Sequence, residues 1–217
     1  MASRAGLCFA AVLVLLALGC QPVEPTDLGD DDAPIGGEAA TDPVGSPDQA
    51  LPATLDELFT ALHSTAAQWQ NAPVVSEVLV NLDGDGAWRE ASVTYLAPDA
   101  DRFLVVQLSA EGTSQEQPTL EGLELSAVPE PALAEVPDPD GLLDPSALID
   151  AAEPTLDECG VGAPPGTVLY ASGAPAAWDG ERWTEPPQWT ATVSFEATAA
   201  VDARSGEPTR ADPCIAD

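Results

Sequence analysis

One short segment carries oxygen-bearing side chains at the spacing of a calcium-binding loop. Asn81, Asp83 and Asp85 alternate along the chain, and Gly86 follows them. In calcium loops, oxygen ligands at the first, third and fifth positions precede a turn glycine, and a bidentate Glu closes the site at the twelfth. Here the twelfth position is Ser92, and strands are expected on both sides. The segment is therefore either a calcium site or a Gly-rich hairpin turn, and the flanking strands favour the turn.

A second candidate site combines aromatic and cationic side chains. Trp178, Trp183 and Trp189 lie close together in the chain, and Arg182 precedes the second of them. Such a cluster could form a platform on which a sugar or a peptide stacks. Aromatic residues on either side of a turn also pack across the strands, which stabilises a hairpin by a few tenths to about 1 kcal/mol per pair. Both interpretations stay open.

The sequence gives little support for catalysis. His63 is the only histidine, so neither a Ser-His-Asp arrangement nor a histidine-rich zinc site can form. No G-x-S-x-G, Walker or dinucleotide-binding motif occurs. The 37 Asp and Glu residues offer many carboxylate pairs of the kind that hydrolyse glycosides, but no pair stands out. We therefore expect a protein that is not an enzyme and holds no cofactor, apart from the candidate calcium. A carboxylate-dependent extracytoplasmic hydrolase is the alternative.

The first nineteen residues have the composition of an export signal. Arg4 is the only charge before an apolar run over residues 7–18, and that run is shorter than the about 20 residues of a membrane-spanning helix. The tail Ala17-Leu18-Gly19-Cys20 resembles the lipobox of bacterial lipoproteins, although the commonest pattern has Leu in place of Ala17 and a small residue in place of Leu18. The resemblance implies cleavage before Cys20 and a lipid on its thiol. An ordinary secretory signal is the alternative.

The lipobox resemblance also implies a location. Gln21 follows the cysteine, where an Asp retains lipoproteins in the inner membrane of some bacteria. We therefore expect a cell-envelope protein at the outer membrane, on its periplasmic or surface face. Residues 20–50 are rich in Pro, Gly and acidic residues, which predicts a disordered tether.

The remaining cysteines, Cys159 and Cys214, form an even pair in a compartment that favours oxidation, so a disulfide is the default. Closing a loop of this length would stabilise the fold by roughly 4 kcal/mol.

The charge of the chain restricts its partners. The net charge is −31, and there is no Lys. A surface this negative repels phosphate backbones and anionic headgroups, so nucleic acid is not an expected partner. The expected partners are the membrane, through the lipid at Cys20, and an envelope protein, peptide or glycan. The acidity is either a solvated surface or a surface for a cation or a basic protein.

The apolar pattern predicts an α+β fold in which a helix precedes an antiparallel meander. A capping box at Thr54 and Glu57 starts the first helix. Asp144 is expected to be the N-cap of a second helix that ends at Ala152. The expected units are residues 51–125, with strands at 74–82, 88–96, 103–109 and a short one at 120–125; a Pro-rich connector, 126–144; and residues 145–217, with strands at 167–172, 188–196 and 199–203.

The end of the chain resembles a known family. The stretch Val201-Asp202-Ala203-Arg204-Ser205-Gly206-Glu207, after the alternating strand that begins at Trp189, is similar to the last strands of PepSY-type domains. These are small α+β modules of envelope and secreted proteins, associated with restraining peptidases and with surface binding. Because helix, strand, Asp-Gly turn and strand occur twice, two repeated PepSY-like or cystatin-like halves are a hypothesis. The expected function is a noncatalytic binding or inhibitory module, with a calcium-dependent surface adhesin as a further alternative.

Overall fold

The computed structural model describes residues 51–97, 103–117, 126–162, 166–194 and 197–215. The expected signal peptide, Cys20 and the tether lie outside these residues. So does the short strand expected at residues 120–125.

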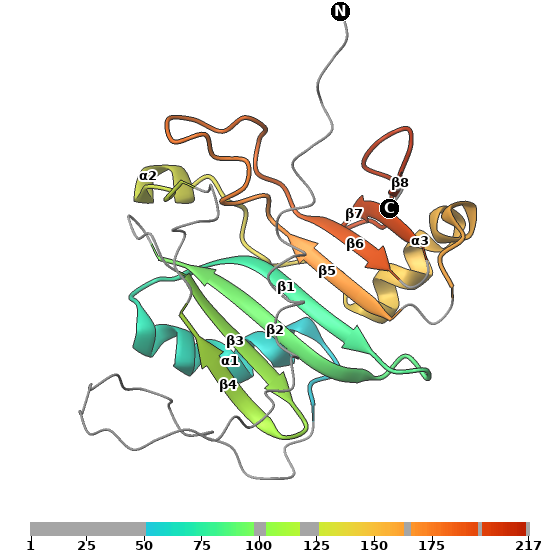
Figure 1. The fold of residues 1–217 in the computed structure, drawn as a ribbon, viewed down its shortest axis with the longest axis horizontal. Helices are drawn as coiled ribbons and strands as arrows, with labels where there is room; N and C mark the ends of the chain where they lie inside the picture. The colour runs from blue at the N-terminus through green and yellow to red at the C-terminus, as the bar shows by residue number, and fades with distance from the viewer. Residues whose placement is uncertain (1–50, 98–102, 118–125, 163–165, 195–196, 216–217) are drawn as a thin grey trace, which may run out of the picture. The chain divides into compact units, whose positions relative to one another are not determined.

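The described strands form one antiparallel sheet in the order β4-β3-β2-β1-β5-β6-β7-β8 (Figure 1). Two meanders meet at its centre, where β1 pairs with β5 and Val78 lies opposite Tyr170. The predicted α+β class is confirmed. The bounds are β1 (Val74–Leu82), β2 (Trp88–Leu96), β3 (Phe103–Ser109), β4 (Gly112–Glu116), β5 (Thr167–Ala171), β6 (Thr190–Ser194), β7 (Thr198–Asp202) and β8 (Cys214–Ile215).

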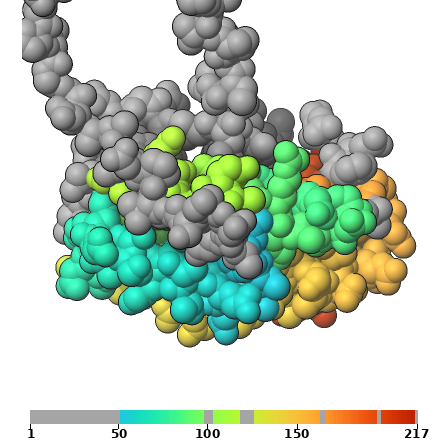
Figure 2. All heavy atoms as spheres, turned by 90° about the horizontal axis from the view of Figure 1, so that it is seen from below, coloured from blue at the N-terminus to red at the C-terminus, as the bar shows by residue number. Residues whose placement is uncertain are grey.

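Two long helices cover one face of this sheet. They are α1 (Leu55–Trp69) and α3 (Pro145–Cys159), and both lie behind the strands in Figure 1. Figure 2, which views the molecule from below, shows α1 (cyan) and α3 (yellow) on one side of the first meander (green). The apolar stripes of both helices are buried in one core with alternate residues of the strands. The largest side chains at most 1% exposed are Trp189, Tyr170, Leu58, Leu62, Leu104, Leu108, Leu148, Val78, Val80, Val93, Val106 and Val168.

The first helix begins as predicted. The Thr54 hydroxyl accepts a hydrogen bond from the Glu57 N–H at 3.2 Å, and the Glu57 carboxylate accepts one from the Ala53 N–H at 2.8 Å. The first bond satisfies a backbone donor that an α-helix leaves unpaired at its N-terminus, and the second holds the residue before the N-cap against the first turn. The helix ends at Trp69, and Gln70 is extended.

The second long helix differs from the prediction in two ways. It continues to Cys159, well beyond Ala152, although Pro154 lies inside it. One proline removes one internal hydrogen bond, and the buried Leu156 in the following turn holds that turn on the sheet. Asp144 precedes the helix but makes no side-chain cap there. Its carboxylate instead accepts a hydrogen bond from the Leu55 N–H of α1 at 2.7 Å.

The Pro-rich connector contains a helical turn that the sequence analysis missed, α2 (Glu130–Leu133). With its neighbours it covers the strand ends on the side of the sheet away from α1 and α3. The buried residues of this second cluster are Leu96, Phe103, Val128, Ala132, Leu133, Val136 and Ala174. The connector is therefore part of the folded body, because it supplies the apolar side chains that cover these strand ends.

The predicted disulfide is present between Cys159 and Cys214. It links the end of α3 to β8, a two-residue strand that pairs with β7. The C-terminal segment is thus fixed to the sheet both covalently and by backbone hydrogen bonds.

Candidate functional site

The sheet surface opposite α1 and α3 carries mostly hydroxyl, amide and carboxyl groups. Directly paired residues of antiparallel strands point to the same side, so the strand register sorts these side chains into three rows. The first row is Glu116, Val105, Thr94, Glu77, Ala171, Thr190 and Asp202; the second is Ser114, Gln107, Ser92, Leu79, Leu169, Thr192 and Ala200; the third is Ser109, Glu90, Asn81, Thr167, Ser194 and Thr198. We call these three rows the polar face.

The third row satisfies its own polar groups. The Asn81 amide donates a hydrogen bond to the Glu90 carboxylate at 3.2 Å, and the Thr167 hydroxyl donates one to the Asn81 carbonyl oxygen at 3.1 Å. This chain of hydrogen bonds joins three strands, β2, β1 and β5. Glu90 therefore has a protein partner for its carboxylate.

Glu77, in the first row, lacks such a partner. Its side chain is partly buried between Thr94 and Ala171, its neighbours on β2 and β5. Burial raises the pKa of the Glu77 carboxyl from its ordinary 4.5 to about 7, and desolvation is the whole cause. Among the described residues, no cation or hydrogen-bond donor offsets that desolvation.

A β-bulge explains why this Glu lies on the polar face. The register of β1 with β2 shifts between Val75 and Glu77. Val75 and Val78 both pack on the main core, so strict alternation from Val75 would have turned Glu77 inward. Ser76 is the extra residue of the bulge. It is buried, and its hydroxyl donates a hydrogen bond to the Thr94 carbonyl at 3.2 Å. The sequence analysis missed Glu77, and the only signal was a single Glu within the apolar stretch Val74-Val75-Ser76-Glu77-Val78.

The four residues of the expected aromatic platform are not all brought together. Trp178 and Trp183 are paired across their turn, with ring centroids 5.1 Å apart and planes at 72°. Both rings pack on the second cluster, and both indole N–H groups are buried without an acceptor among the described residues. Arg182 is exposed and pairs with Asp179 at 3.6 Å. Trp189 is in the main core, where its N–H donates to the Pro137 carbonyl at 2.8 Å.

The candidate calcium loop has the hydrogen bonds of a hairpin turn. One Asp83 carboxylate oxygen accepts from the N–H groups of Asp85 and Ala87 at 2.9 and 3.0 Å. The Asn81 side chain is committed to its neighbours in the third row. Within the described ranges, no group of three or more His, Cys, Asp or Glu side chains could hold a metal ion. Calcium binding at Asn81, Asp83 and Asp85 stays a prediction, and the turn explains these residues without it.

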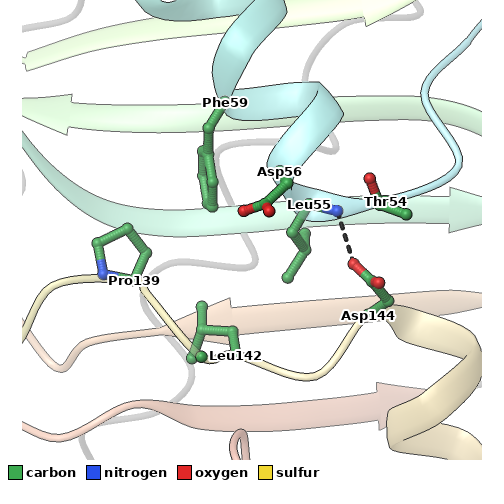
Figure 3. Close-up of a pocket in the computed structure, with 8 residues that line it drawn as sticks. Thr54, Leu55, Asp56, Phe59, Pro139, Leu142 and Asp144 are labelled. Atoms are coloured by element: carbon green, nitrogen blue, oxygen red, sulfur yellow. Dashed lines mark hydrogen bonds between the residues drawn. The ribbon is translucent and has the colours of Figure 1, made fainter.

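A pocket of about 250 Å³ lies between the start of α1 and the segment that precedes α3 (Figure 3). Phe59, Leu142 and the carboxylate of Asp56 line it, together with Asp144. Because the Asp144 carboxylate caps α1, this pocket joins the helix layer to the connector. Its two acids, Asp56 and Asp144, are therefore not both free to act as the carboxylate pair that the hydrolase alternative requires.

Every helix in the described ranges is too short or too polar for a membrane span. Comparisons of the chain with protein-family models, with curated proteins and with solved structures found no match.

Proposed function

We propose that this chain is a lipid-anchored protein of the cell envelope whose folded domain binds a protein, peptide or polysaccharide without catalysing a reaction. The observation that carries the proposal is the polar face, which neither α1 nor α3 covers. The second cluster packs on this face only at its first row, at Val105. The surface is rich in Ser and Thr hydroxyl groups that can exchange hydrogen bonds with a partner.

The dimensions of the polar face suit a macromolecular partner. With about 4.8 Å for each of the seven strands and about 6.8 Å for each of the three rows, the polar face measures roughly 34 by 20 Å, or about 700 Å². A standard protein interface buries about 800 Å² on each partner. Small-molecule sites, by contrast, are concave and mostly apolar. A sheet surface of this size and polarity therefore favours a binding role.

The anchor is supported by the lipobox resemblance at Cys20 and by the composition of residues 21–50. A flexible chain of about 30 residues reaches about 30 Å on average, enough to hold the domain clear of a bilayer surface. Mass spectrometry of the mature protein tests this part. We expect an N-terminal Cys20 that carries fatty acyl mass, and a mature terminus elsewhere without acyl mass would disprove it.

We propose further that the two halves are structural repeats of a PepSY-like or cystatin-like unit. The support is the strand order, which runs outward from β1 in one half and from β5 in the other, and the helix that precedes each meander. An experimental structure tests the idea by superposition. We expect residues 55–116 to overlay residues 145–215 through a twofold axis between β1 and β5.

The binding role is tested with a bulky charged substitution on the polar face. Thr192 lies in the second row, so Thr192→Arg should obstruct a partner there. Ser64→Arg adds the same charge to an exposed position of α1 and serves as the matched control. Mature protein in detergent is used to capture partners from the native envelope. We expect the first variant alone to lose the captured partner, and equal capture by both variants would argue against this surface.

A further inference from the structure

Building on the proposed binding role of the polar face, we propose that its partner is a basic polypeptide that places a Lys or Arg side chain against the Glu77 carboxylate.

The Glu77 carboxyl is desolvated and has no cation or hydrogen-bond donor beside it among the described residues. A carboxylate that loses water needs hydrogen-bond donors or a cation in exchange. Glu90, on the same surface, has a donor in Asn81, whereas Glu77 has none among the described residues. A partner's ammonium or guanidinium group would supply both charge and donors.

The chain has few basic residues that could pair with Glu77. It has six Arg and no Lys against 37 acidic residues. Of the four described arginines, Arg182 pairs with Asp179, Arg204 donates to the Asp138 carbonyl at 2.7 Å, and Arg210 is exposed. A hydrogen bond with the Ser109 side chain lowers the pKa of the Glu111 carboxyl, and Arg89 lies close enough to contribute to the same shift. None of them affects Glu77, since desolvation alone accounts for its pKa.

The acidic residues of the first row are evenly spaced across the sheet. Glu116 is on β4 and Asp202 on β7, each three strands from Glu77. One Asp202 carboxylate oxygen accepts hydrogen bonds from the N–H groups of Arg204 and Ser205 and from the Ser205 hydroxyl, so a partner would bind the other oxygen. At about 4.8 Å per strand, the acids are about 14 Å apart, which an extended chain spans in about four residues. A partner strand that crosses the sheet along this row would therefore match the acids with basic residues at every fourth position. Side chains four apart in a strand point to the same side.

The charged groups around Glu77 determine how pH acts on this site. Thr94 and Ala171 beside it are neutral, and Glu116 and Asp202 are at the ends of the row. The segments that form the second cluster, which packs against Val74 and Val105, add exposed charges at Glu130, Glu135, Asp179, Glu181 and Arg182. Because the pKa of Glu77 is about 7, the carboxylate that attracts a cation is largely present above pH 7. Affinity should fall about tenfold for each pH unit below it.

The test uses mature protein and defined peptides at physiological salt, with binding measured by calorimetry. The probe is an acetylated and amidated nonapeptide, KTTTKTTTK, with Lys at every fourth position. A second peptide of the same composition, KTTKTTTTK, breaks the spacing, and ETTTETTTE reverses the charge. We expect Glu77→Gln to weaken binding of the probe at least tenfold. Glu153→Gln, on the exposed side of α3, removes the same charge and should change binding less than twofold.

Several outcomes would overturn the proposal: equal loss in both variants, which indicates diffuse charge attraction; equal affinity for the acidic peptide; or no saturable binding of the probe. A further contrary result would come from the amide resonances of the polar face. They would shift when residues 21–50 are deleted and would stay unchanged when any of the peptides is added. The chain's own segment would then be the occupant. If Thr192→Arg abolishes capture of the native partner while Glu77→Gln has no effect, the binding role stands and the basic partner does not.

Discussion

Replacing Glu77 by Gln should stabilise the folded protein, and the gain should depend on pH. Glutamine has nearly the shape of a protonated Glu but cannot ionise. The folded state holds the proton of Glu77 up to about pH 7, whereas the unfolded chain releases it near 4.5. Between these values the unfolded state binds fewer protons, so the wild type loses stability as the pH rises. Below pH 4.5 both states are protonated, and the substitution should have little effect.

The expected size follows from the two pKa values. The difference between 4.5 and about 7 corresponds to about 3 kcal/mol at about 1.4 kcal/mol per pH unit. This free energy is the cost of keeping an ionised carboxylate in a partly buried position without a partner. The free energy of unfolding of Glu77→Gln should therefore exceed that of the wild type by up to about 3 kcal/mol at pH 8. At pH 4 the two proteins should be equal within about 0.5 kcal/mol.

Urea denaturation of both proteins, with the disulfide intact, measures the difference at pH 4, 6 and 8. Glu90→Gln is the matched control, because it removes the same charge from the same face while Gln can still accept the hydrogen bond from Asn81. We expect the control to change stability by less than about 0.5 kcal/mol at each pH. A Glu77→Gln difference that stays constant with pH, or a loss of stability at pH 8, would refute the assignment of an unpartnered, desolvated carboxylate.

Three further predictions concern the fold. Replacing Cys159 and Cys214 together by Ser should lower the free energy of unfolding by about 4 kcal/mol, because the bridge closes a loop of 55 residues; an unchanged urea midpoint would contradict this. Gly206→Ala should cost about 2 to 5 kcal/mol, since φ is +73° and a Cβ would lie 2.9 Å from a backbone carbon of α3. Gly84→Ala, where a Cβ meets nothing within 4 Å, should cost under about 0.5 kcal/mol, and urea denaturation of both variants measures the difference. Tyr170→Phe removes a buried hydroxyl that donates to a backbone carbonyl at 2.8 Å and should cost about 1 to 2 kcal/mol in urea; a gain in stability would show that bond to be unimportant.

Local patterns predicted those elements in which one physical signal dominates. The capping box of α1 places its first turn, and the alternation in β2 and β6 separates core from surface residues. β4 carries no such signal, because its residues Gly112–Glu116 are almost all polar. It is a strand because β3 presents a free backbone edge, and a tight turn brings the chain back along it. Such an element depends on its neighbour and cannot be recognised from its own composition.

Two proline-containing segments show the same limit for helices. The sequence predicted that the second long helix ends at Ala152. The helix continues through Pro154 to Cys159, because tertiary packing of the turn that follows outweighs one missing hydrogen bond. Pro131 follows the first residue of α2, where its missing N–H has no intrahelical partner to lose. Packing of Ala132 and Leu133 on the strand ends then holds the turn. In both segments the proline does remove a backbone hydrogen-bond donor, but the buried side chains that follow it keep the turn helical.

The position of Glu77 links the proposed partner to the stability of the whole domain. The residue lies on β1 at the junction of the two meanders, with Thr94 of one half and Ala171 of the other beside it. Without a partner, ionisation at this junction costs the folded state about 3 kcal/mol. A bound cation would lower the pKa of Glu77 and return part of that free energy, so the partner should stabilise the fold more at pH 8 than at pH 6. Linkage requires the reciprocal effect, in which raising the pH strengthens binding by the same factor. A carboxylate that is destabilising in the free protein is therefore the feature that would make recognition of a basic partner depend on pH.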